Sequence, residues 1–175
     1  MSEELENTQQ TEEQETPTTG DNTPVAEDTS GASTSVINQV VEAVMDLIDD
    51  LNLFATTTRG ALTTGPSISV EVGPSSPEVV FMDKNCYLPL DITINAKHEN
   101  LQTLTEAMNT IHSSLTRMTS YPEDTPTDPT DSTYDSRWEI VDIVTGTLPQ
   151  VIGREENDEW MMASSLYVKF YWKGD

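Results

Sequence analysis

The sequence contains little cysteine, histidine or positive charge, and each shortage excludes a class of protein. Among its 175 residues Cys86 is the single cysteine, so no intramolecular disulfide can form. Two histidines and one cysteine are also too few for a structural zinc site of the usual kind. We therefore expect a fold that is stabilised by packing, with no metal and no cofactor.

Lysine and arginine are scarce, with eight against 31 aspartates and glutamates, which gives a net charge of −23. Specific nucleic-acid binding needs basic side chains that displace counterions from phosphates, and anionic membrane surfaces attract basic segments. We therefore expect neither partner. No apolar run reaches the length of a membrane span, and residues 1–10 lack the basic and apolar regions of a secretory signal.

The composition divides the chain into two parts. Residues 1–35 contain acids but no base, many Thr, Gln, Pro and Ser, and almost no large apolar side chain, so we expect a disordered acidic tail. An acidic arm that binds a partner is the alternative for this segment. Residues 36–175 contain enough apolar sequence for one domain with its own core.

Two segments carry apolar residues at the three- and four-residue steps of a helix. They predict helices over about 36–53 and about 101–118. Thr34 or Ser35 would cap the first helix and Asn100 the second, because short polar side chains accept hydrogen bonds from free backbone N–H groups. The apolar stripe of the second helix is narrow, as is typical of a helix that lies across a sheet.

Alternating apolar residues predict five strands. They cover Ser67–Val72, Glu78–Met82, Cys86–Ile94, Arg137–Leu148 and Trp160–Trp172. Short turns predict antiparallel pairing within the first three strands and between the last two. The segment Ala55–Pro66 would be a connector, 119–136 a mobile loop, and Pro149 a break after the fourth strand. Pro89 should turn its nitrogen to an edge or bulge.

Together these elements predict an α+β fold, in which a mostly antiparallel five-stranded sheet carries both helices on one face. The sequence contains no Gly-rich phosphate loop and no G-x-S-x-G motif. We expect Cys86 to be a core residue, His98 a solvated or capping residue, and His112 a packed or locally hydrogen-bonded one.

Within the 119–136 loop, residues 123–131 contain four acids, but the loop lacks the central glycine and the closing glutamate of a calcium loop. The four acids are Glu123, Asp124, Asp128 and Asp131. We therefore expect that the protein is not an enzyme, although a hydrolase with a carboxylate pair stays as an alternative.

Surface turns and sheet edges remain as candidates for contact with a partner, because turns on a rigid sheet commonly carry function and edge strands must be covered, charged or paired. The candidate turn residues are Pro74, Ser75, Ser76, Asp83, Lys84, Asn85, Glu156, Asn157 and Asp158. The alternative for each turn is a plain solvated turn.

Several spaced motifs carry a resemblance to a known family. They are Tyr87-Leu88-Pro89-Leu90, Asn95–Asn100, Ser120-Tyr121-Pro122, Trp138–Ile143, Thr147-Leu148-Pro149, Trp160, Ser164-Ser165 and Val168–Lys173. Over about residues 36–173 the chain resembles the minor capsid or tail terminator proteins of long-tailed bacteriophages (siphophages). The acidic tail 1–35 and the long loop 121–136 depart from that pattern, which leaves open which surface meets a partner.

The resemblance implies a structural protein of the virion at the head–tail junction, assembled in the host cytoplasm. Such proteins form a ring, typically a hexamer, that caps the tail tube, stops its polymerisation and presents a surface for the head connector. The implied partners are further copies of the chain, the tail tube protein and the connector protein, and DNA passes through the ring. The alternative is a free acidic binding module or nucleic-acid mimic that engages a basic partner.

Overall fold

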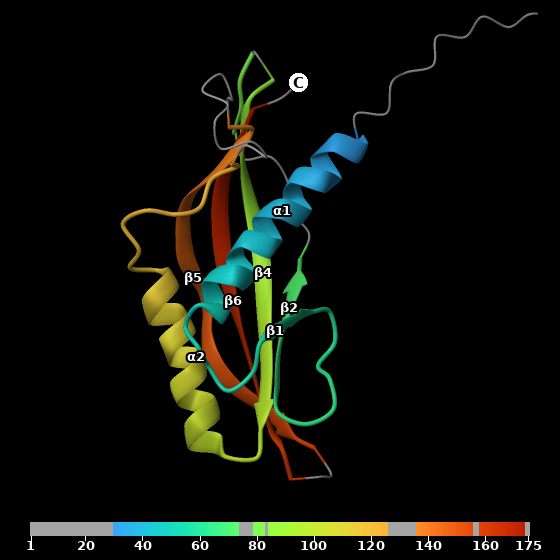
Figure 1. Cartoon of the computed structure of the whole chain (residues 1–175), viewed down its shortest axis with the longest axis vertical. Coiled ribbons are helices and arrows are strands. Elements are labelled where there is room, and N and C mark those ends of the chain that lie inside the picture. The colour runs from blue at the N-terminus through green and yellow to red at the C-terminus, as the bar shows by residue number, and fades with distance from the viewer. Residues whose placement is uncertain (1–29, 74–78, 83, 126–135, 156–157, 174–175) are drawn as a thin grey trace, which may run out of the picture.

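The computed structural model describes residues 30–73, 79–82, 84–125, 136–155 and 158–173. The elements are α1 (Ser30–Asp49), β1 (Thr57–Arg59), β2 (Ser67–Val72), β3 (Val79–Val80), β4 (Cys86–His98), α2 (Leu101–Leu115), β5 (Trp138–Arg154) and β6 (Trp160–Trp172). They form two layers, with one mostly antiparallel sheet and both helices on the same face of it (Figure 1). The α+β prediction is confirmed.

The strand order in the sheet is β1-β2-β4-β6-β5, and β3 also pairs with β4. Because β6 pairs with β4 along its whole length, β2 and β3 must share the opposite side of β4, one after the other. The expected antiparallel pairing of 67–72 with 78–82 is therefore wrong, since each of these strands pairs with β4 instead.

The core lies between the sheet and the helices. Its largest fully buried side chains include Ile48, Ile68, Leu90, Ile92, Ile94, Leu104, Met108, Ile111, Leu115, Ile143, Leu166 and Phe170. Burial of each such side chain contributes about 1.5–3 kcal/mol. Cys86 belongs to this core and burial raises the pKa of its thiol, as expected for a packed cysteine.

The second helix begins as predicted and the first does not. The Asn100 side chain accepts hydrogen bonds from the backbone N–H groups of Gln102 and Thr103, which confirms the cap of α2. The helix α1 begins at Ser30, so residues 30–35 are helical and neither Thr34 nor Ser35 is its cap. The rest of the predicted tail, 1–29, lies outside the described residues.

Three strand predictions need correction. The predicted connector Ala55–Pro66 contains β1, which pairs in parallel with β2, so the described sheet has six strands rather than five. The strand β4 continues to His98. The strand β5 runs through Pro149 to Arg154, because Pro149 lies in a bulge on an edge strand, where a missing N–H costs no ladder bond.

The position of Pro89 agrees with its expected place at an edge. Asp91 accepts a hydrogen bond from Gly73 N through its backbone oxygen, so the polar backbone groups of Asp91 face the side of β2. Pro89 lies two residues earlier and turns its nitrogen to the same side. Its position falls between the stretches of β4 that pair with β3 and with β2.

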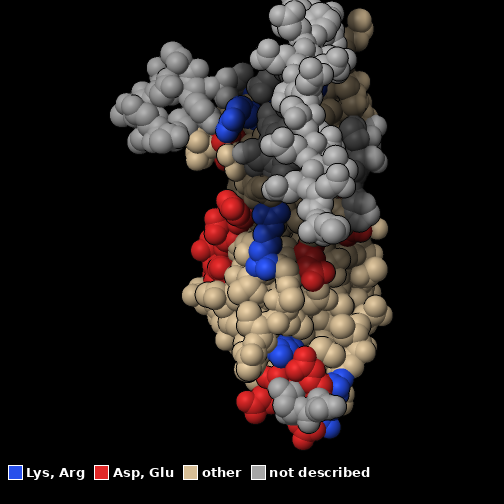
Figure 2. Space-filling model, turned by 90° about the vertical axis from the view of Figure 1, so that its right-hand side faces the viewer, with Lys and Arg blue, Asp and Glu red and all other residues tan. Residues whose placement is uncertain are grey.

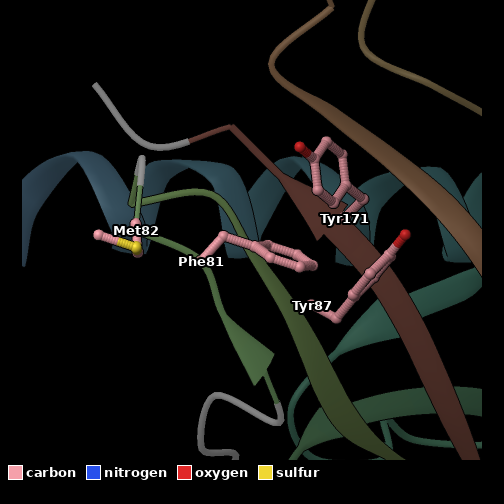
Figure 3. A pocket seen from close by; sticks show the side chains of 4 residues that line it. All are labelled: Phe81, Met82, Tyr87 and Tyr171. Atoms are coloured by element: carbon pink, nitrogen blue, oxygen red, sulfur yellow. The ribbon is translucent and has the colours of Figure 1, made fainter.

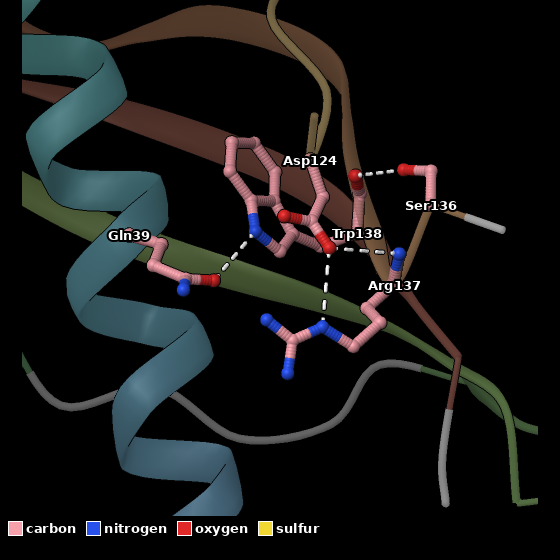
Figure 4. Close-up of polar contacts among 5 residues, drawn as sticks. All are labelled: Gln39, Asp124, Ser136, Arg137 and Trp138. Atoms are coloured by element: carbon pink, nitrogen blue, oxygen red, sulfur yellow. Dashed lines mark hydrogen bonds and ion pairs between the residues drawn. The ribbon is translucent and has the colours of Figure 1, made fainter. Parts of the chain in front are cut away.

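The first part of the predicted mobile loop is fixed against β5. Ile140 N donates to Pro122 O at 3.0 Å, and Asp124 N donates to Trp138 O at 2.8 Å. The backbone N and the Nε of Arg137 both donate to Asp124 Oδ2, and Ser136 Oγ donates to the Trp138 carbonyl (Figure 4). The mobile-loop prediction is therefore wrong for these residues, while 126–135 lie outside the described part.

Candidate interaction surface

On the face of the sheet away from the helices, the type of side chain differs between the middle and one end. Its middle carries small polar side chains, such as Thr93, Ser165 and Thr147, which face one another across β4, β6 and β5. Thr147 N donates to Ser165 Oγ at 3.0 Å, and the two hydroxyl oxygens lie 3.1 Å apart. The Ser165 and Thr147 hydroxyls therefore bond to each other in the middle of this face.

One end of the same face is aromatic. The ring centroids of Tyr87 and Tyr171 lie 5.1 Å apart, and those of Phe81 and Tyr87 lie 5.9 Å apart. Lys169 Nζ lies 5.1 Å from the Tyr87 ring, at cation–π distance. The three rings and Met82 line a shallow hollow of about 500 Å³, in which the fully exposed Met82 side chain points away from the rings (Figure 3).

The edge strand β5 is longer than the strand it pairs with. From Trp138 to Arg154 it covers 16 residue steps, while β6 covers 12 from Trp172 to Trp160, so β5 contains four extra residues. These correspond to the four register shifts along the pair. Bulges bend an edge strand and re-aim its side chains.

The outer edge of β5 is apolar. Val141, Val144, Leu148, Val151 and Ile152 are all exposed, and Leu148 reaches 74 %. Residues 143–153 contain no charged side chain, although acids dominate the chain. Beyond the bridge between Glu123 and Glu139, no described strand pairs with this edge. Natural edges are usually protected by charge, so this edge is typical of one that pairs in an assembly.

The predicted turn residues divide between the two ends of the sheet. Lys84 and Asn85 close the hairpin before β4, where Phe81 N donates to Asn85 O and Lys84 adopts a φ of 67°. Asp158 lies in the opposite hairpin, 3.3 Å from Arg154 Nη2. The structure therefore does not bring these turns together. Six further candidates lie outside the described residues: Pro74, Ser75, Ser76, Asp83, Glu156 and Asn157.

Sequence reasoning missed Phe81 and Met82 at the first hairpin, and Leu148 and Ile152 on β5. An apolar pair directly before a charged turn, and apolar residues on both sides of a strand proline, were the available signals. The alternation predicts Met82 and Leu148 as strand ends and places Ile152 after a break, because alternation alone does not say which face or edge another element covers.

An ionic cluster fixes the opposite hairpin. Lys97 Nζ lies 3.1 Å from Glu155 Oε2 and 3.3 Å from Glu159 Oε2, and the side chains of Lys97 and Glu159 are nearly buried. The pKa of Lys97 is raised, mainly by its hydrogen bond to Glu155. The hydrogen bond to Glu159 raises the pKa further, while burial opposes the increase. Figure 2 shows basic and acidic side chains gathered at this lower end of the molecule.

The residues weighed for catalysis lie apart from one another. His98 Nδ1 accepts a hydrogen bond from Asn100 N at 2.8 Å, and its ring packs edge-on against Phe54. His112 is buried, and its Nδ1 lies 3.2 Å from Thr145 Oγ1. Both positions agree with the local roles expected for them. Burial lowers the pKa of His112.

The described part of the chain contains no group of three or more His, Cys, Asp and Glu side chains placed to hold a metal ion. Of the loop acids considered for calcium, Asp124 bonds to Arg137, and Asp128 and Asp131 lie outside the described residues. Neither described helix combines the length and the apolar character that a membrane span requires.

Comparison of the chain with protein-family models and with curated proteins gives no match.

Proposed function

We propose that this protein is a structural component of the head–tail junction of a long-tailed bacteriophage. It forms a ring, a hexamer by the resemblance, that caps the tail tube, stops its polymerisation and presents a surface to the head connector. The role needs no covalent chemistry. Its place is the virion, after assembly in the host cytoplasm.

The observation that carries the proposal is the outer edge of β5. A long, exposed apolar edge that is uncharged over residues 143–153, on an otherwise acidic chain, is a surface for assembly. The spaced motifs that resemble the phage family include this strand, through Trp138–Ile143 and Thr147-Leu148-Pro149. Head-to-tail contacts between identical copies close into a ring when the rotation between neighbours allows it.

The proposal is tested by deletion of the gene from the phage that carries it. A tube without its terminator continues to grow, so we expect electron micrographs with overlong tails of irregular length and heads without tails. Expression of the wild-type chain from a plasmid should restore tails of one length. Particles with tails of normal length in the deletion strain would contradict the proposal and favour the free acidic binding module.

A further inference from the structure

The exposed large apolar side chains of the described residues fall into two sets, which lie toward opposite edges of the sheet. The hairpin set, on β2, β3 and the turn that follows, is Val72, Val79, Val80, Phe81 and Met82. The edge set, on β5 and the adjoining β6, is Val141, Val144, Leu148, Val151, Ile152 and Tyr167. The strands β4 and β6 separate the hairpin from β5, so one copy cannot bring its own two sets together.

Each set is large enough for a specific interface. From their exposed fractions, the side chains of each set present roughly 500 Å² to solvent, which is close to the apolar share of the about 800 Å² that each partner buries in a standard interface. The largest apolar patch on a typical monomer covers about 300–600 Å² and is often functional. Both sets therefore have the area that a contact between copies requires.

Charge favours the edge set over the rest of the surface. Copies with a net charge of −23 repel one another, so they can approach most easily where acids are absent. Residues 143–153 contain no charged side chain, whereas the hairpin set is bordered in the sequence by Glu71, Glu78, Asp83 and Lys84. By contrast, the exposed side of α1 carries Glu42 and Asp46.

We propose that the hairpin set of one copy packs against the edge set of the next copy. This inference rests on the proposed ring, since it specifies how neighbours in that ring touch. Each copy carries one set of each kind toward opposite edges of its sheet, so the contact is head-to-tail and repeats around the ring. The Phe81 and Met82 side chains of one copy then lie against Leu148 and Ile152 of its neighbour.

Cysteine cross-linking of the full-length chain tests this contact. Met82 and Leu148 are strongly exposed, so Met82→Cys and Leu148→Cys leave the core intact, and the buried Cys86 can stay because it is shielded from reagent. The double variant M82C/L148C is treated with a short bismaleimide over a range of protein concentrations. The wild-type chain and N109C/L148C, which moves one thiol to the exposed face of α2, are the controls.

We expect a ladder of cross-linked species from M82C/L148C that ends at the ring, and loss of the ladder in both controls. An equimolar mixture of M82C and L148C should stop at dimers, because each pair then has one reactive contact. Absence of a ladder from the double variant would overturn the inference, as would cross-linking of either single variant alone as efficient as that of the mixture. Overlong tails in the deletion strain without a ladder would leave the proposed function standing and refute only this contact.

Discussion

At the scale of single residues, Lys97 and Glu159 form a buried ion pair in which each charge stabilises the other. Both side chains are nearly excluded from solvent, and Glu155 completes the cluster at 37 % exposure. If the cation is removed, the buried carboxylate still bears the free-energy cost of desolvation, and no opposite charge offsets that cost. The cluster also joins the end of β4 to the turn between β5 and β6.

Replacement Lys97→Met should therefore lower the free energy of unfolding by about 3 kcal/mol, as is usual when one partner of a buried pair is removed. Urea unfolding at pH 7 measures this loss. Asp158→Asn is the matched control, because its pair with Arg154 is exposed and should contribute less than about 1 kcal/mol. Equal effects of the two substitutions would refute the role of burial.

The Lys97 contribution should also depend on pH. The pKa of Lys97 is raised in the fold, so its stabilisation is complete below the ordinary value of 10.5 and is lost as pH rises through the folded pKa. Alkaline unfolding of the wild-type chain and of K97M measures this. The difference in stability between the two should stay constant from pH 7 to 9 and shrink above pH about 10.5.

Another buried titratable residue, His112, predicts sensitivity to acid. Its pKa is lowered by burial, so below the ordinary value of 6.5 the unfolded chain binds a proton that the folded chain does not. Stability should fall with decreasing pH by at most about 1.4 kcal/mol per pH unit from this residue. His112→Gln should remove that part of the slope between pH 6.5 and 5, measured by urea unfolding, and an unchanged slope would contradict the assignment.

At the scale of elements, the bulges of β5 depend on a close approach at Gly146. A Cβ at this position would lie 2.5 Å from Ser165 Oγ and 3.1 Å from Tyr167 Cε2, so neighbouring groups would have to move. At Gly153, the nearest atom is the flexible end of Met161, at 3.3 Å. The two glycines lie on the same strand and differ in what surrounds them.

Gly146→Ala should therefore destabilise the fold by about 1–3 kcal/mol, as overpacking usually does. Gly153→Ala should cost less than about 1 kcal/mol, because the Met161 side chain can move. Thermal unfolding of both variants measures the difference. A larger loss for G153A than for G146A would show that the packing around this bulge is not as described.

At the scale of the whole molecule, charge opposes association and apolar contact favours it. Because the copies repel, added salt should strengthen ring formation: the screening length falls from about 30 Å at 0.01 M salt to about 10 Å at 0.1 M. Sedimentation at several protein concentrations should show a larger associated fraction at high salt. Weaker association with added salt would indicate an interface made of ion pairs instead.

The α+β class, the Asn100 cap and the strand Trp160–Trp172 could be predicted because local periodicity and capping chemistry determine them. The strand β1 could not, because its parallel partner β2 and the hydrogen bond from Thr57 N to Asp49 Oδ1 come from tertiary contact. The continuation of β5 through Pro149 could not be predicted either, because it requires β5 to be an edge strand, and the order of strands in the sheet is not visible in the sequence.

The interaction surface was predicted only in part, for a related reason. Projecting turns can be recognised from Gly, Pro and Asn, and the hairpin that contains Lys84 and Asn85 is one of them. Exposure of Met82 and Leu148 could not be predicted from these local signals, because apolar residues in strands are usually buried and the sequence does not show which element covers them. Only the sheet order shows that no described element covers them.

Immunogold electron microscopy of the phage particles, with antibody raised against residues 36–175, tests the central claim most directly. Label concentrated at the junction between head and tail is the result predicted here. Intact particles that are labelled elsewhere, or not at all while a known virion protein is labelled in parallel, would contradict the claim that this chain forms the junction ring.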